Sequence, residues 1–203
     1  MKSIKYIIIF LFISVFSFSQ TLEYEVFFMG KKVGVYIANV TNKDNHSTIK
    51  VYGNSTFTFI KKFSIIYKSE SRFTNGHFVY SNSRKYNNGK RKDSVLVHRN
   101  RDNKFDIYSY ESGESVINNI FFTGSLLYFS EPNNIKEIFA ENKGYFVPIS
   151  KIEEHTFVTI DKERNEKITY YYFKNVLVKA IIEKSIFTLE MKLIKYDKNK
   201  STD

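Results

Sequence analysis

Hydrophobic and polar residues alternate with a period of two through most of this chain. The alternation is clearest in residues 22–28, 49–59 and 187–193, and it is typical of antiparallel strands that bury one face. Asn75-Gly76 and Asn87–Gly89 lie between such runs. Asparagine and glycine tolerate the positive φ of tight hairpin turns. The pattern therefore predicts a sheet built from consecutive hairpins.

The alternating runs and turn signals together predict about ten or eleven strands. We expect them at residues 22–29, 32–41, 47–60, 61–74, 77–86, 92–99, 104–110, 145–151, 155–161, 166–173 and 176–194. The last segment is long enough to be a hairpin, with its turn near Lys184-Ser185.

Residues 120–142 interrupt the alternation and predict a helical insert of two short pieces. Thr123 is the expected cap of the first piece. The second piece follows Pro132, with Asn133 or Asn134 as its cap.

The first 19 residues have the pattern of a secretory signal peptide. Lys2 and Lys5 form a positive start, and an almost unbroken apolar run follows. Ser17 and Ser19 are the small residues expected just before a cut at Gln20. About a dozen apolar residues are too few to cross about 30 Å of hydrocarbon. We therefore expect an exported protein, periplasmic or extracellular, and no transmembrane span in its mature chain.

Removal of residues 1–19 leaves residues 20–203, which is enough for one domain with its own core. The net charge then falls from +10 to +8, because two lysines leave with the signal. The chain has no cysteine, so disulfides, thiol catalysis and cysteine metal sites are excluded. We expect one β-rich domain that ends in a polar tail at residues 196–203.

Many short strands and one insert predict an all-β fold of mainly antiparallel strands. We expect a strongly curved sheet, a half-barrel or a barrel, with the helical insert packed over it. A barrel inserted in a membrane is the alternative for an exported chain of this size. Lys68, Glu70 and Arg72 on one face of residues 61–74 count against that alternative.

The sequence contains no recognisable catalytic, cofactor or metal motif. The histidines (His46, His77, His98 and His155) lack metal-ligand spacing, and no serine elbow or glycine-rich phosphate loop occurs. The carboxylates available for acid–base work are Asp93, Asp106, Glu131, Glu153 and Glu154, and nothing in the sequence pairs them. We therefore predict no catalytic residue and no cofactor, and an enzyme stays possible only through a convergent site.

One hairpin is strongly basic. It contains Arg84, Lys85, Lys90, Arg91 and Lys92, and it favours contact with an anionic partner such as lipid head groups. The alternative is a solvated turn whose charges aid solubility. Nucleic acid is not an expected partner, since no binding motif for it occurs.

Four segments, taken in order, resemble one family. They are residues 30–34, 88–93, 126–141 and 168–175, and the stretch Leu126–Pro132 is the most specific of them. In these segments the chain resembles a family of exported bacterial proteins known only as a domain of unknown function, family 6134, over about residues 22–194. The family is similar, more remotely, to curved-sheet envelope carrier domains. The resemblance implies a fold and no catalytic residues.

Aromatic-rich strands and an apolar insert favour a non-enzymatic binding or carrier domain for an apolar or amphipathic ligand. The side chains expected to line its cavity are Leu126, Phe129, Ile138, Phe139, Tyr170 and Tyr172. The alternative is an interaction module whose concave face is filled by its own insert. A lipid or another envelope component is the expected partner.

Overall fold

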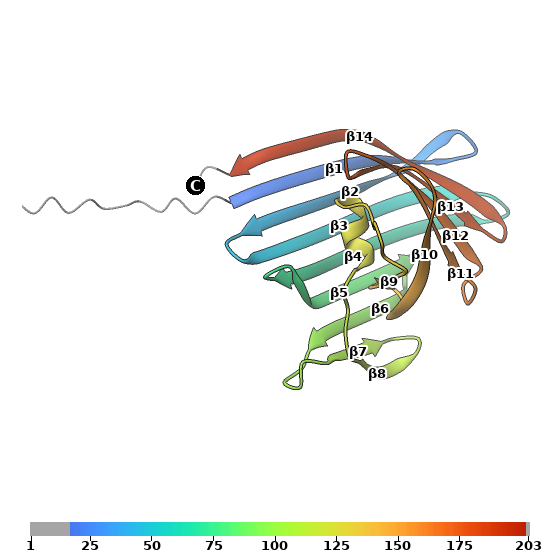
Figure 1. Ribbon diagram of the computed structural model, residues 1–203. Helices are drawn as coiled ribbons and strands as arrows, with labels where there is room; N and C mark the ends of the chain where they lie inside the picture. The colour runs from blue at the N-terminus through green and yellow to red at the C-terminus, as the bar shows by residue number, and fades with distance from the viewer. Residues whose placement is uncertain (1–16, 202–203) are drawn as a thin grey trace, which may run out of the picture.

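The computed structural model describes residues 17–201, which form one antiparallel sheet and a short 3-10 helix (Figure 1). The helix η1 spans Gly124–Tyr128. The strands are β1 Ser17–Phe28, β2 Lys31–Lys43, β3 His46–Thr58, β4 Lys62–Thr74, β5 His77–Asn87, β6 Lys90–Arg99, β7 Phe105–Ser109, β8 Gly113–Ile117, β9 Glu137–Ala140, β10 Tyr145–Glu153, β11 Thr156–Asp161, β12 Glu166–Phe173, β13 Val176–Lys184 and β14 Phe187–Ser201.

The sheet is open, and its first and last strands pair in the middle. The strand order is β8-β7-β6-β5-β4-β3-β2-β1-β14-β13-β12-β11-β10-β9. Strand β1 pairs with β14 from Ser17↔Ser201 to Phe28↔Leu189, so the two ends of the described chain lie side by side (Figure 1). The remaining neighbours along the chain are hairpins, except that one long segment joins β8 to β9 at the opposite edges of the sheet.

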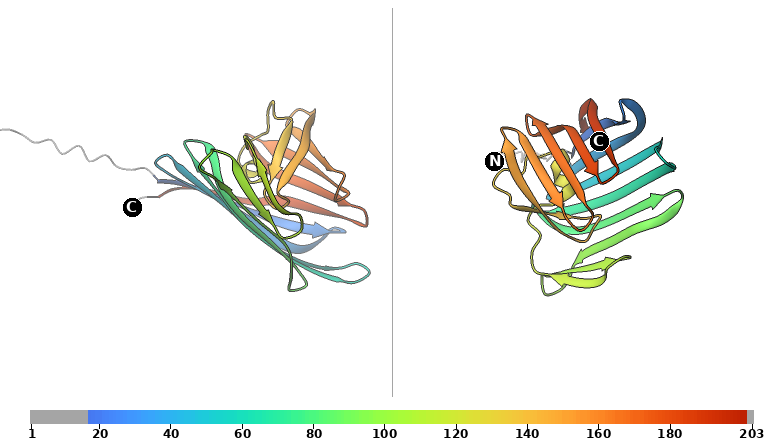
Figure 2. Two further views of the ribbon diagram at one scale, coloured as in Figure 1. Left: turned by 90° about the horizontal axis from the view of Figure 1, so that it is seen from below. Right: turned by 90° about the vertical axis from the view of Figure 1, so that its right-hand side faces the viewer.

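The sheet curves until its two arms face each other. Figure 2 shows strands β1 to β8 as one arm and β9 to β13 folded over it as the other. The joining segment crosses the space between the arms and carries η1. Inward-facing side chains from both arms, such as Tyr24, Val97 and Phe157, are buried there with Leu127 of η1. The core therefore lies inside the bend, as expected for a sheet that buries one face.

The hairpin predictions are confirmed at both asparagine–glycine turns. Asn75 and Gly76 have φ values of 51° and 75°, and Asn88 and Gly89 have values of 49° and 76°. The hairpin expected near Lys184-Ser185 is also present, between β13 and β14. The all-β, strongly curved architecture is thus as the alternation indicates.

The expected second helical piece after Pro132 is wrong. Asn134 has a φ of 62°, which a right-handed helix excludes, and residues 137–140 form strand β9, paired with β10. The first piece exists as η1, but the Thr123 side chain does not cap it; its hydroxyl pairs with that of Ser125 at 2.9 Å. Burial of β9 between the arms outweighs local helix preference.

Two further boundaries differ from the prediction. Strand β8 was not expected, because it is an exposed edge strand with almost no apolar alternation. Residues 196–201, expected as a polar tail, continue β14, with Tyr196 opposite Leu22 and Lys198 opposite Gln20. Backbone pairing with β1 needs no apolar side chains, so hydropathy alone does not predict it. Of the expected signal peptide, residues 1–16 lie outside the described part, and Ser17–Ser19 begin β1.

Candidate functional site

A partly open cavity of about 230 Å³ lies between the two arms of the sheet. Its walls come from β1 to β5 on one side and from β9 to β14 on the other, with η1 and the β9–β10 turn beside them. A dry cavity of about 150 Å³ holds benzene, and drug-sized ligands need about 300 Å³ or more. The volume therefore suits a slender apolar group rather than a bulky ligand.

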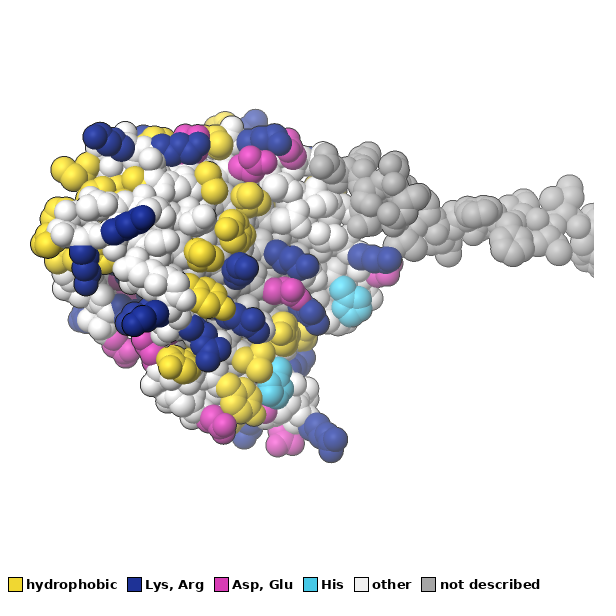
Figure 3. All heavy atoms as spheres, turned by 180° about the vertical axis from the view of Figure 1, so that it is seen from behind, with side chains coloured by type: hydrophobic (Ala, Val, Ile, Leu, Met, Phe, Trp, Pro, Cys, Tyr) yellow, Lys and Arg dark blue, Asp and Glu magenta, His cyan; other side chains and the backbone are white. Residues whose placement is uncertain are grey.

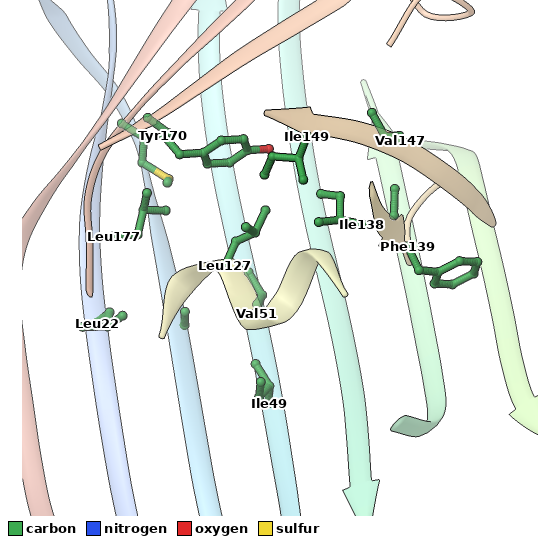
Figure 4. Packing of buried hydrophobic residues seen from close by; sticks show 14 of the residues in the cluster. Leu22, Ile49, Val51, Leu127, Ile138, Phe139, Val147, Ile149, Tyr170 and Leu177 are labelled. Carbon is green, nitrogen blue, oxygen red and sulfur yellow. The ribbon is translucent and has the colours of Figure 1, made fainter. Parts of the chain in front are cut away.

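The inner end of the cavity is apolar. Its walls include Val51, Leu127, Tyr170 and Leu177. Figure 4 shows Leu127 pointing from η1 toward Tyr170 of β12, with Val51 of β3 close to the helix. The insert thus occupies part of the concave face and leaves a narrower space beside it.

Four tyrosines add hydroxyl groups to this apolar wall: Tyr36, Tyr67, Tyr128 and Tyr170. Burial, followed by the charge of Glu141, raises the pKa of Tyr67 to about 12, and burial likewise raises the pKa of the other three. The Tyr67 hydroxyl lies 3.1 Å from the Ser83 hydroxyl. At neutral pH these groups are uncharged and can hydrogen-bond a ligand without acting as bases.

Charged side chains line the cavity where β12 begins at Glu166 and β13 ends at Lys184. We call this part of the cavity its outer end. Lys143 lies 2.5 Å from Asp161 and 2.8 Å from Glu166, and Lys184 lies 2.5 Å from the other Glu166 oxygen. Tyr145 also donates to Asp161, at 2.8 Å. Burial alone would raise the pKa of Glu166, but Lys143 and Lys184 hold it below its ordinary value. The same balance of burial against Lys143 and Tyr145 lowers the pKa of Asp161.

Arg164, in the β11–β12 turn, connects the two arms. Its guanidinium lies 2.7 Å from Asp93 of β6 and 2.8 Å from Glu111 in the β7–β8 turn. Asp93 is buried, so this ion pair is shielded from solvent on the carboxylate side. The contact spans 71 positions and helps to set the spacing between the cavity walls.

Lys85 is a cavity residue and not part of the outward basic surface. Neighbouring residues of a strand point to opposite faces, so Arg84 and Lys85 cannot both face solvent. Arg84 is exposed, whereas Lys85 is half-buried and shares the inner face of β5 with Ser81 and Ser83. Of the five hairpin cations, Lys85 thus lines the cavity, and the exposed ones are Arg84, Lys90, Arg91 and Lys92. Strict alternation along β5 was the signal that could have shown it.

Lys90, Arg91 and Lys92 are exposed at the β5–β6 hairpin, as the sequence indicates. The same end of the sheet carries exposed apolar residues in neighbouring turns: Met29 (79% exposed), Ile60 (87%) and Ile186 (56%). Figure 3 shows apolar and basic side chains together at the end of the molecule farthest from the grey segment. We call this end, defined by these six residues, the hairpin rim.

The structure places some of the residues expected to line the cavity in its wall and others elsewhere in the core. Ile138 and Tyr170 are in its wall. Phe139 instead packs between Phe78 and Phe146, and Tyr172 packs edge-on against Phe157.

Leu126 of η1 and Phe129, which directly follows the helix, pack against the core outside the cavity wall. The other residues of η1 line the cavity, and Leu127 and Tyr128 contribute its large side chains there. The sequence pattern did not indicate Leu127 or Tyr128 as cavity residues. It also did not indicate Lys143, Glu166 and Lys184 at the outer end.

The carboxylates and histidines considered for chemistry do not converge on the cavity. Asp106 accepts a hydrogen bond from Asn100 and lies beside His98, and Glu131 pairs with His155 at 2.8 Å. The described part of the chain holds no group of three or more histidine, cysteine or carboxylate side chains placed to bind a metal ion. Within residues 17–201 there is also no apolar helix of membrane-spanning length.

These features define a class: an open, curved antiparallel sheet with a small amphipathic cavity between its arms. A solved protein of this architecture is the beta-barrel-like protein of domain of unknown function DUF1849 from Brucella abortus. The two share 10% sequence identity, the match covers 92% of this chain and 99% of that one, and the TM-score is 0.59. At this identity the likeness is one of fold. Residues 24–194 match DUF6134, a domain of unknown function, and the chain belongs to that family. No curated protein matches it.

Proposed function

We propose that this protein is a non-enzymatic carrier that holds one apolar chain of an amphipathic ligand in the cavity between its arms. The observation that carries the proposal is the cavity itself, whose wall combines apolar side chains such as Leu127 and Leu177 with charged ones such as Glu166 and Lys184. Such a combination matches a molecule with an apolar chain and a polar head. Within the described residues no group of side chains is placed to bind a metal ion, and the acid–base groups that meet at the cavity, Lys143, Glu166 and Lys184, are held in ion pairs with carboxylates or lysines of the protein itself. This arrangement favours binding over catalysis.

The hairpin rim supports delivery at a lipid surface. Its apolar tips can enter the headgroup region, while Lys90, Arg91 and Lys92 face anionic lipid head groups. Lys85 and Lys184 lie near this same end of their strands. A ligand could therefore pass between the membrane and the outer end of the cavity. We commit to an anionic membrane surface as the partner of this rim.

Export completes the proposal. The N-terminal pattern predicts a mature chain that starts at Gln20, which lies within β1 and pairs with Lys198. N-terminal sequencing of protein recovered from its own cells tests this. A mature chain that retains residues 1–19 would contradict the assignment to the periplasm or the exterior.

Native mass spectrometry of protein purified from its own envelope tests the carrier function. We expect a bound species of one lipid or fatty acid per chain. The variant Ser55→Leu fills the cavity wall at a buried position and should lose that species. The matched control Asn54→Leu alters the exposed neighbouring position of β3 and should retain it.

A wild-type protein without any bound amphiphile, and without affinity for added ones, would favour the second candidate. In that case η1 serves to fill the concave face, and the protein is a structural or interaction module. The burial of Leu127 inside the bend is the observation that favours this alternative.

A further inference from the structure

Lys85 differs from the other cations at the cavity. Lys143 and Lys184 each lie within 2.8 Å of a carboxylate, and Arg164 pairs with Asp93. Among the residues that the structure describes, no carboxylate lies within 4.0 Å of the Lys85 ammonium, and no hydrogen bond from it is present. Its side chain nevertheless turns into the cavity wall rather than toward solvent.

The surroundings of Lys85 disfavour its charge. Burial, followed by the positive charge of Lys184, lowers its pKa, and Arg164 acts in the same direction. Glu166 and Asp93 oppose this only in part, because each is already paired with other cations.

The remaining charged groups of the cavity are engaged with other partners and do not pair with Lys85. Lys143 is already shared between two carboxylates. Glu141 accepts hydrogen bonds from the Ser71 hydroxyl and from the backbone N–H of Ser125. Lys85 is therefore a half-buried cation, beside a second lysine, to which the protein offers no acceptor. An anionic partner would offset the unfavourable surroundings of its charge.

We infer that Lys85, together with Lys184, forms a head-group site that selects an anionic amphiphile, a single apolar chain ending in a carboxylate or a phosphate. This inference rests on the proposed carrier function and specifies its ligand. The chain would lie against Leu127 and Tyr170, and the anion would sit between two lysines that otherwise repel each other. A charge-assisted hydrogen bond to each lysine would hold it.

Isothermal titration with three probes of equal chain length tests the inference: decanoate, decyl phosphate and decyltrimethylammonium, each below its micelle concentration. We expect wild type to bind both anions more tightly than the cation. Lys85→Met should weaken anion binding by about tenfold to a hundredfold, the range for a hydrogen bond to a charged group. It should leave cation binding equal or stronger. The control Lys68→Met removes an exposed lysine from the outer face of β4 and should change nothing.

The outcomes separate the two proposals. Equal affinity of wild type for all three probes would overturn the anion site and leave the carrier intact. No binding of any probe would overturn both. Tighter binding of decyl phosphate than of decanoate, or the reverse, tells which anion the site prefers. Should Lys85→Met fail to fold, Lys85→Gln serves in its place, and the comparison of anion with cation in wild type needs no variant.

Discussion

The Ser71 hydroxyl donates a hydrogen bond to the Glu141 carboxylate at 3.0 Å, although 70 positions separate the two residues. Ser71 lies on the inner face of β4, and Glu141 directly follows β9 in the opposite arm. The same carboxylate accepts the backbone N–H of Ser125 at 3.1 Å, so it also holds the start of η1. This buried contact joins both arms and the insert.

Glu141→Ala should therefore lower the free energy of unfolding by about 2 kcal/mol, because the buried N–H of Ser125 loses its acceptor. Chemical denaturation measures this. Glu137→Ala, at an exposed position of β9, is the control and should cost less than about 0.5 kcal/mol. Equal stability of the two variants would mean that the carboxylate does not hold the insert.

Tyr24→Phe should destabilise the fold by about 1–2 kcal/mol. Tyr24 is fully buried and donates to the carbonyl of Leu177 at 2.9 Å, which links β1 to β13. The variant leaves that carbonyl without its donor. Tyr52→Phe removes a hydroxyl from the outer face of β3 and should be nearly neutral. Thermal unfolding of both variants makes the comparison, and a neutral Tyr24→Phe would contradict it.

The charged groups at the outer end of the cavity should make the free energy of unfolding fall as the pH is lowered in the acid range. The folded-state pKa of Glu166 lies below its ordinary value of 4.5, so below pH 4.5 the unfolded state binds more protons. The stabilisation is therefore present above pH 4.5 and is lost as the pH falls through the folded-state pKa. Asp161 acts in the same direction.

Unfolding free energies measured from pH 7 to pH 3 check this dependence. Glu166→Gln should reduce the loss of unfolding free energy between pH 7 and pH 3. The exposed control Glu163→Gln should lose as much unfolding free energy over this range as wild type does. An unchanged loss in Glu166→Gln would argue against the lysine contacts as its source.

Substitutions in the β12–β13 turn should increase the stability of the protein. Lys174 and Asn175 have φ values of 49° and 65°, which this turn requires at both central positions and which asparagine and glycine adopt at lower cost. The double variant Lys174→Asn/Asn175→Gly should stabilise the protein by about 1 kcal/mol. Lys174→Gln removes the charge without easing the backbone and should bring no gain. A thermal midpoint below that of wild type for the double variant would refute the argument.

Neutralising Lys90, Arg91 and Lys92 to glutamine should weaken binding to anionic vesicles by roughly two orders of magnitude, at about 1 kcal/mol for each cation. Added salt should mimic the loss. The control neutralises Arg99, Arg101 and Lys104, which lie exposed around the β6–β7 turn at the opposite end of the sheet. Equal vesicle binding by both triple variants would leave the rim cations with a role in solubility only.

The alternation of side chains was enough to predict the hairpins, because strand period and turn chemistry depend on neighbouring residues. It failed where burial comes from distant segments. Strand β9 exists because residues 137–140 are enclosed between the arms, and the end of β14 exists because it pairs with the start of the described chain.

The sequence alone therefore determined the antiparallel strands, their turns and the all-β class. Only the tertiary structure decided that β1 pairs with β14, that the arms fold over η1, and that Lys85 faces a cavity beside Lys184. The physical reason is the separation along the chain of the residues that interact. Periodicity and turn preference are local, whereas the curvature of a sheet and the pairing of charges across it depend on contacts between residues far apart in the chain.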